Sequence, residues 1–295
     1  MAAAPVSFER LASRGAFESS PPDHLFHYTD LEGVEGILTS KSLWMSKFTA
    51  SNDISEITLA ISQFQNFVES RVAALHADEA SFLHEAAAQL DGFRRTNICL
   101  ASFCEHPDLL SQWRSYGNDG RGIALGFDTR VLEDLAKRHS LRLWQCVYDP
   151  ATHVRVSNDL LTMLLESFRG ARPKGAEERR ELIAQFHATF LRVAPVIKDH
   201  RFAEEKEWRL ISSPIAFDHP QMIAVFGANH ASVKMKLPLA PAEREVTHLI
   251  SRVVIGPTPL DPQNVADAIA VLSRRNGFRI ADIGFSGIPY RRTDL

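Results

Sequence analysis

The sequence has few cysteines, no long apolar run and no excess of basic residues. Its 295 residues include only three cysteines at irregular spacing, which excludes a disulfide framework and a four-cysteine zinc site. No apolar run approaches the roughly 20 residues that a membrane-spanning helix needs, and the N-terminus lacks the apolar segment of a signal peptide. We therefore expect a cytoplasmic protein with reduced thiols and no membrane contact.

The charge balance and the missing motifs argue against further classes. The formal net charge is −3 at pH 7, so the chain lacks the basic footprint typical of nucleic-acid-binding proteins. It contains no His-Glu-x-x-His run, no G-x-x-x-x-G-K-[ST] loop and no G-x-S-x-G elbow. Asp23, His24 and His27 have no obvious further ligand in the sequence, so we expect no metal.

The chain combines short apolar strands with amphipathic helices. Strand-like runs predominate towards both ends, and helical spacing predominates near residues 54–92 and 157–201. The two patterns do not alternate regularly enough for a Rossmann sheet, which favours the α+β class. We expect a mobile N-terminal tail over residues 1–22 and one domain over residues 23–295 that carries the two helical insertions.

Residues 26–46 form the most informative segment. They predict a strand that includes His27, a helix capped by Asp30 and a second strand. His27, Tyr28 and Thr29 place three hydrogen-bonding side chains where the first strand meets the helix. A lone histidine beside a core strand is more often structural, and Tyr28 and Thr29 also suit a simple helix entry, so structural and ligand-binding roles both stay open.

This order of elements resembles the opening of the ADP-ribosyltransferase fold in its diphtheria-toxin and poly-ADP-ribose polymerase branch. The resemblance implies a split β-sandwich of α+β class, with NAD as the substrate. It implies that His27 holds a ribose hydroxyl of NAD, with Tyr28 and Thr29 beside it. Trp44 and Ser46 of the second strand then line the nicotinamide pocket, although the tyrosine typical of that strand is missing.

Glu207 begins the alternating run EWRLI, where the fold that the chain resembles has its catalytic glutamate. A carboxylate there stabilises the oxocarbenium-like ribose as nicotinamide leaves. With Glu204 and Glu205 it also resembles a solvated charge cluster, and this alternative stays open. Arg114 and Tyr116, on a predicted short helix, are candidates for the diphosphate or acceptor side, unless that helix only packs on the core.

The chain from about His24 onward resembles a bacterial family of unknown function, domain family 2971. The matching pieces are the HYTD opening, Asn52-Asp53, residues 102–128, residues 205–211, Ile255-Gly256 and residues 286–291. The family resemblance is specific, but it does not assign an activity.

Two classes of function follow. The first is an NAD-dependent ADP-ribosyltransferase or NAD glycohydrolase with Glu207 and His27 as catalytic residues, which transfers ADP-ribose to a protein or nucleic-acid acceptor; a role as a toxin or phage-defence effector is compatible with it. The second is a non-catalytic nucleotide- or protein-binding module on the same fold, which the missing tyrosine favours. Glu207 and His27 on facing walls of one cleft would favour the first class, and their placement on unrelated surfaces would count against it.

Overall fold

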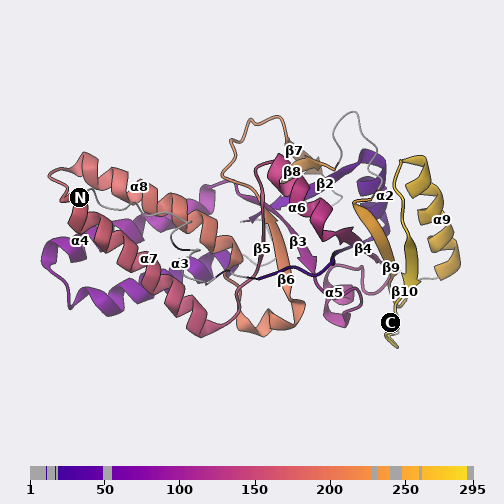
Figure 1. Ribbon diagram of the computed structural model, residues 1–295, viewed down its shortest axis with the longest axis horizontal. Coiled ribbons are helices and arrows are strands. Elements are labelled where there is room, and N and C mark those ends of the chain that lie inside the picture. The colour runs from indigo at the N-terminus through magenta and orange to yellow at the C-terminus, as the bar shows by residue number, and fades with distance from the viewer. Residues whose placement is uncertain are drawn as a thin grey trace. The chain divides into compact units, whose positions relative to one another are not determined.

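Figure 1 shows the computed structural model, which describes residues 11, 17, 19–48, 55–226, 231–239, 248–258 and 261–290. The chain divides into two compact units. The helical unit comprises Met1–Ser19, Phe48–Ile98 and Cys146–Ala203, and the sheet unit comprises Ser20–Lys47, Cys99–Gln145 and Glu204–Leu295. Of the predicted mobile tail, Leu11, Phe17 and residues 19–22 are described, and Leu11 is fully buried.

The described part of the helical unit contains long helices from two separate segments of the chain. They are α3 (Ser55–Val72), α4 (Ala77–Ala88), α7 (Pro150–Ala171) and α8 (Ala176–Val193), with the 3-10 helices η2 (Gln89–Arg95) and η3 (Ala194–Val196); η4 (His200–Glu205) follows. Helix α7 begins before residue 157, where the predicted helical segment starts. The reason is Asp149, whose carboxylate accepts hydrogen bonds from the backbone of Ala151 and Thr152 ahead of a first-turn proline.

Aromatic rings form the centre of the helical unit. The ring of Phe64 lies 5.1 Å from that of Phe186 and 5.8 Å from that of Phe190. Nearby, the rings of Phe82 and Phe168 stack at 4.4 Å. The helical unit therefore has its own core.

The sheet unit contains ten described strands, of which only β9 and β10 pair in parallel. The strands are β1 (His24–Thr29), β2 (Ser42–Lys47), β3 (Cys99–Cys104), β4 (Ile123–Asp128), β5 (Arg142–Gln145), β6 (Glu207–Ile211), β7 (Met222–Phe226), β8 (Ala231–Pro238), β9 (Ile250–Ile255) and β10 (Asp282–Phe285). Their order is β10-β9-β4-β1-β3-β2-β8-β7, while β6 pairs with β3 and β5 with β6. The helices are α2 (Leu31–Ser40), α5 (Leu110–Ser115), α6 (Thr129–Arg138) and α9 (Pro262–Arg275). The predicted α+β class is confirmed.

Strand β3 has two different neighbours along one edge. On its other edge it pairs with β6 over residues 100–104. On the shared edge, β2 pairs with Cys99 and Leu100, whereas β1 pairs with Cys104. Strands β1 and β2 therefore separate along residues 101–103 of β3, and we call this place the strand split.

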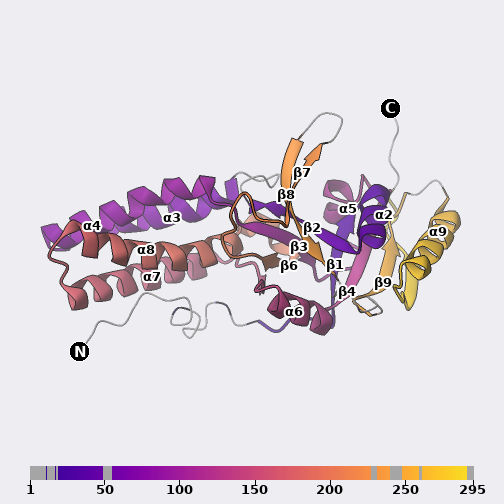
Figure 2. The same ribbon diagram turned by 90° about the horizontal axis from the view of Figure 1, so that it is seen from above.

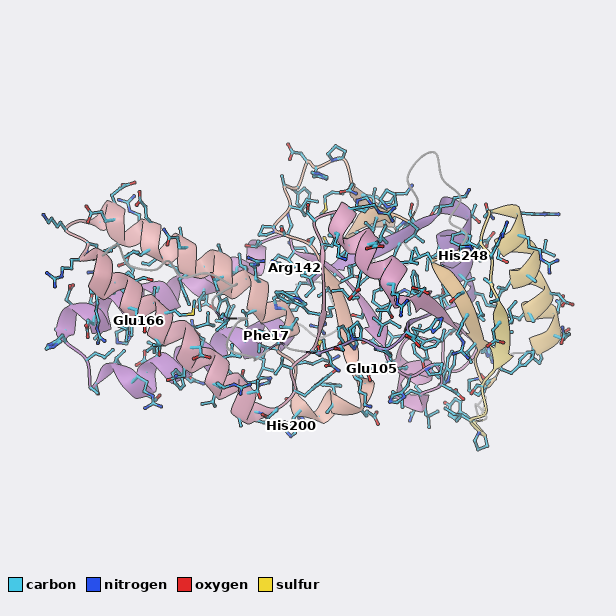
Figure 3. The ribbon with its side chains drawn as sticks, viewed as in Figure 1. Phe17, Glu105, Arg142, Glu166, His200 and His248 are labelled. Carbon is cyan, nitrogen blue, oxygen red and sulfur yellow. The ribbon has the colours of Figure 1, made fainter. Side chains whose placement is uncertain are left out.

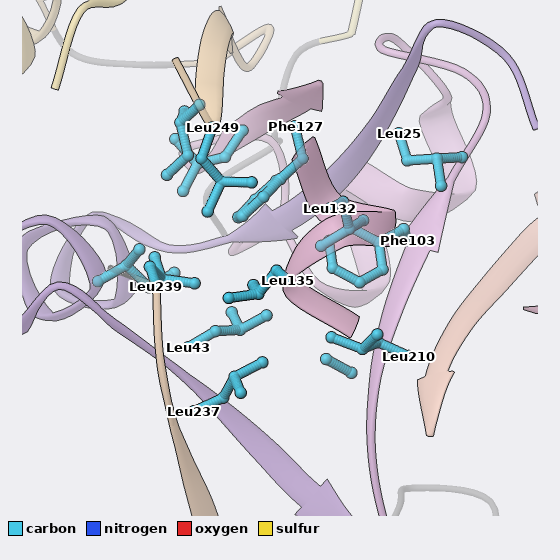
Figure 4. Close-up of a cluster of buried hydrophobic side chains, with 14 of the residues drawn as sticks. Leu25, Leu43, Phe103, Phe127, Leu132, Leu135, Leu210, Leu237, Leu239 and Leu249 are labelled. Atoms are coloured by element: carbon cyan, nitrogen blue, oxygen red, sulfur yellow. The ribbon is translucent and has the colours of Figure 1, made fainter. Parts of the chain in front are cut away.

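One large hydrophobic core lies on a single face of the sheet (Figure 4). It includes Leu25, Leu43, Phe103, Leu125, Phe127 and Leu210 from the strands, with Leu38 from α2, Leu135 from α6 and Ile269 from α9. We call this the core face. On the opposite face, Trp113 of α5 packs against Tyr28 and Cys104 in a smaller cluster.

Three helix starts follow directly from capping aspartates. Asp30, Asp128 and Asp261 each precede a helix of the sheet unit. Their side chains accept hydrogen bonds from the backbone nitrogens of Gly33 at 2.7 Å, Val131 at 3.1 Å and Asn264 at 3.0 Å. The predicted cap at Asp30 is therefore confirmed, because a carboxylate there satisfies an amide that the first turn leaves unpaired.

The sequence from Phe278 to Ile283 also predicts a strand, and this prediction is wrong in its position. Strand β10 begins only at Asp282. The backbone nitrogen of Phe278 instead donates to Ser273 of α9, after Gly277 with φ of 81°, and the ring is buried against the core. Phe278 therefore closes the helix, which is a common arrangement at a helix C-terminus.

Candidate functional site

His27 lies at the strand split. Its Nδ1 is 2.9 Å from the carbonyl oxygen of Ser102, and a carbonyl oxygen only accepts, so Nδ1 carries the hydrogen. In the neutral ring Nε2 is then an acceptor, and no described residue forms a hydrogen bond with it. The residue as a whole is partly buried. His27 is thus fixed at one nitrogen, and its other nitrogen has no hydrogen-bond partner among the described residues.

Burial holds the pKa of His27 below its usual value of 6.5, while the hydrogen bond with Ser102 acts in the opposite direction. The ring is therefore neutral at pH 7, and Nε2 is available as an acceptor. The imidazole ring also lies 5.7 Å from that of Phe103, at the margin of the core.

Tyr28 and Thr29 have structural contacts in this arrangement. The Tyr28 hydroxyl donates to the carbonyl of His106 at 2.8 Å and accepts from the backbone nitrogen of Leu109 at 3.1 Å. Its ring meets Trp113 edge-on at 4.7 Å, and burial is the main reason why its pKa is raised. Tyr28 thus holds the segment between β3 and α5. Thr29 ends β1, opposite Ile123.

Trp44 and Ser46 share one face of β2, away from the core face. Trp44 is 45% exposed and pairs with Lys236 of β8. Ser46 pairs with Lys234, whose Nζ donates to the Ser46 hydroxyl at 2.7 Å. Figure 2 shows the β7–β8 hairpin beside β2. Lys234 is a site residue that the motifs did not indicate.

Glu207 is a buried carboxylate in an ion pair. Arg209, two residues along β6, donates from Nε to Oε1 at 2.8 Å and from Nη2 to Oε2 at 3.0 Å. Only 5% of Glu207 and 2% of Arg209 is exposed. The predicted alternative of a solvated charge cluster is therefore wrong for Glu207, while Glu204 is exposed and Glu205 is partly so.

The register places Glu207 and His27 on opposite faces of the sheet. Phe26 pairs with Cys104, and Cys104 pairs with Glu207, so these three side chains point to one face. His27 follows Phe26 and points to the other face, with Leu125 as its partner on β4. The arrangement does not bring the two predicted catalytic side chains face to face.

The same register brings Glu207 to the face of Trp44 and Ser46. Ser46 pairs with Leu100 of β3, and Leu100 pairs with Ile211, four residues after Glu207 on β6. Residues four apart on a strand share a face. We call this surface the Glu207 face.

Arg114 and Tyr116 lie on α5 and directly after it, and both are exposed. Trp113, on the side of α5 that faces β1, is fully buried. Its indole nitrogen donates to Asp108 at 2.6 Å. The helix therefore packs on the sheet through Trp113, and it leaves Arg114 and Tyr116 at the surface.

Asp108 and Glu105 are central contacts that the motifs did not single out. Asp108 also accepts from the hydroxyl of Ser286 at 2.6 Å and the backbone nitrogen of Gly287 at 2.8 Å. Glu105, labelled in Figure 3, accepts from the side-chain nitrogens of Gln145 and Trp208 at 3.0 Å each. Both carboxylates join separate parts of the sheet unit. The matching motif residues Asn52, Asp53 and Arg291 lie outside the described residues.

Other site types find no support within the described part of the chain. It holds no cluster of three or more His, Cys, Asp or Glu side chains arranged for a metal ion. None of its helices is long and apolar enough to cross a membrane. A cavity of about 10 Å³ in the helical unit has room for about one water molecule, and its His153 is already bonded to Gln63 and Val147.

The fold and these contacts define an α+β protein whose mostly antiparallel sheet is split beside a fixed, neutral histidine. The segment from residue 112 to residue 210, which runs from α5 into β6, matches the model of a family described as Protein of unknown function (DUF2971). This match supports the resemblance to that family which the sequence motifs indicate. No curated protein and no solved structure matches the chain.

Proposed function

We propose that the sheet unit binds a ribonucleotide at the strand split, with NAD as the expected ligand. The observation that carries the proposal is His27, whose Nδ1 is held by Ser102 and whose Nε2 is an unused acceptor. A ribose hydroxyl is a donor of the matching kind. The resemblance to the ADP-ribosyltransferase fold supports the same assignment, because there the corresponding histidine holds a ribose of NAD.

A planar ring of the ligand fits the exposed indole of Trp44. The side chain is 45% exposed although it stands on a central strand, and its indole face is large and flat. The hydroxyl of Ser46 lies on the same face of β2. This pairing of a stacking surface with a hydroxyl supports the nicotinamide or base side of the nucleotide.

His27→Asn weakens the binding of NAD and ADP-ribose by about 5–10-fold, because one hydrogen bond from the ribose is lost. The asparagine amide still donates to Ser102, which preserves the local contact, but nothing replaces Nε2. Isothermal titration calorimetry measures the effect. His24→Asn is the matched control: this histidine lies on the same strand and bonds to Ser251 at 3.0 Å, so its replacement leaves affinity unchanged. Equal losses in both variants would argue against a site at His27.

ADP-ribosyl transfer or NAD hydrolysis is the second candidate function, and Glu207 favours it. The carboxylate shares its face of the sheet with Trp44 and Ser46. In this reaction the bond from ribose to nicotinamide breaks, its electrons stay on nicotinamide, and an acceptor or water bonds to the ribose and loses a proton. A carboxylate stabilises the positive charge that develops on the ribose.

Nicotinamide release separates the two candidates. If Glu207 is catalytic, wild-type protein releases nicotinamide from NAD and Glu207→Gln does so at least about 100-fold more slowly while it still binds NAD. Chromatography of the reaction mixture measures the product. Binding of NAD by the wild type without release, in folded protein, leaves a nucleotide-binding module as the function.

A further inference from the structure

Lys234 is a partly buried ammonium without a carboxylate partner among the described residues. Its Nζ donates one hydrogen bond, to the Ser46 hydroxyl at 2.7 Å. The other two of its three N–H donors have no acceptor among the described residues. Burial lowers the pKa of Lys234, as expected for a cation withdrawn from water without a counter-charge. Cations withdrawn from water are normally paired with an anion, and no described residue supplies one to Lys234.

The strands around Lys234 carry positive charge only. Strands β2, β7 and β8 contain Lys47, Lys234 and Lys236 and no aspartate or glutamate. Lys234 and Lys236 lie on the same face, opposite Ser46 and Trp44 respectively. An anion with more than one charge suits this surface better than a single carboxylate.

We infer that Lys234 and Ser46 form a phosphate-binding subsite, beside which Trp44 stacks on the ring of the same ligand. The ammonium supplies charge and two donors, and the serine hydroxyl supplies a further hydrogen bond to a phosphate oxygen. The chemical class of the ligand is therefore a phosphate or diphosphate ester that carries a planar ring.

The phosphate subsite and His27 lie on opposite faces of the sheet, close to the same stretch of β3. Ser46 pairs with Leu100 of β3, two residues before Ser102, whose carbonyl holds His27. Two residues of a strand span roughly 7 Å. One nucleotide would contact both His27 and Lys234 only by passing through the strand split, where β1 and β2 separate along β3. Only this link rests on the proposed function, and the phosphate subsite does not depend on it.

Titration calorimetry with inorganic pyrophosphate, adenosine and ADP-ribose tests the inference on the full chain. Lys234→Met preserves the length and apolar part of the side chain but removes the charge. It weakens the binding of pyrophosphate and ADP-ribose by about 10–100-fold and leaves that of adenosine unchanged. Lys236→Met is the matched control, since Lys236 lies on the same strand and face but is exposed; it changes affinity by less than about 3-fold. Thermal unfolding of each variant verifies that it is folded.

Each outcome decides the inference. Similar losses in Lys234→Met and Lys236→Met would show diffuse attraction and overturn the subsite. Binding of adenosine and ADP-ribose that Lys234→Met leaves intact would overturn the subsite but preserve the proposed function. Lysine-dependent binding of pyrophosphate without any binding of adenosine or NAD would support the subsite and overturn the proposed function. If the wild type binds none of the three, both are wrong.

Discussion

Replacing Arg209 with methionine lowers the free energy of unfolding by about 3–5 kcal/mol. The guanidinium makes two hydrogen bonds to the Glu207 carboxylate, and both side chains are almost fully buried. Methionine leaves the carboxylate in a low-dielectric interior without its cation. The cost of an uncompensated buried charge exceeds the net gain of the pair itself, so the single replacement is severe. Urea denaturation followed by circular dichroism measures it.

Arg201→Met is the matched control for this effect. Arg201 binds Asp199 with the same i, i+2 spacing and the same two-point geometry, at 2.9 Å and 2.7 Å, but its side chain is 76% exposed. An exposed pair contributes little, so this variant loses less than about 1 kcal/mol. A loss in Arg209→Met no larger than that in Arg201→Met would contradict the prediction.

The double variant Glu207→Met with Arg209→Met recovers most of the lost stability, because neither charge of this pair then stays buried. It also separates structure from chemistry. A folded double variant that still binds NAD but releases no nicotinamide assigns Glu207 to the reaction rather than to the fold.

Local structure was largely predictable from the sequence. An aspartate directly before an apolar helical pattern accepts a hydrogen bond from a backbone amide three residues later. The start of α2 after Asp30 is therefore predictable from neighbouring residues alone. The alternation in EWRLI similarly predicts β6, because one face of a strand differs chemically from the other. Strand β7, with the sequence MIAVF, was not predicted. It is uniformly apolar, so it shows no alternation of polar and apolar residues that would indicate a strand.

The sequence pattern could not predict that His27 and Glu207 lie on opposite faces of the sheet. Alternation shows which residues of one strand share a face, but pairing between strands decides which faces coincide. The pair of Phe26 with Cys104 determines which side chains of β1 and β3 share a face of the sheet. The pair of Cys104 with Glu207 then places Glu207 on the same face as Phe26. A shift of one residue would have put His27 and Glu207 on the same face.

Lys234 carried a weak signal that the motifs did not use. In the run VKMKL, lysines occupy the alternate positions of a strand whose other positions are apolar. This pattern predicts that Lys234 and Lys236 share a face, but it predicts an exposed one. Lys234 is partly buried because it has a paired residue on both sides, Ser46 of β2 and Ile223 of β7, whereas Lys236 lies beyond the start of β7.

Replacing Asp108 with alanine lowers the free energy of unfolding by about 3–4 kcal/mol. Its carboxylate accepts hydrogen bonds from the indole of Trp113 at 2.6 Å, the hydroxyl of Ser286 at 2.6 Å and the backbone nitrogen of Gly287 at 2.8 Å. Trp113 is fully buried, so its indole N–H would lose the Asp108 acceptor in a place that water does not reach. Urea denaturation measures the global loss.

Hydrogen exchange tests the mechanism of this loss, because Asp108 ties residues 286–290 to α5. In Asp108→Ala, the amide of Gly287 exchanges much faster than in the wild type, since its acceptor is gone. Asp282→Ala is the matched control: this aspartate, on nearby β10, pairs with Arg252 at 3.3 Å, and more than half of its side chain is exposed. Its loss costs less than about 1 kcal/mol and leaves Gly287 protected. Unchanged protection of Gly287 in Asp108→Ala would show that this carboxylate does not hold the C-terminal segment.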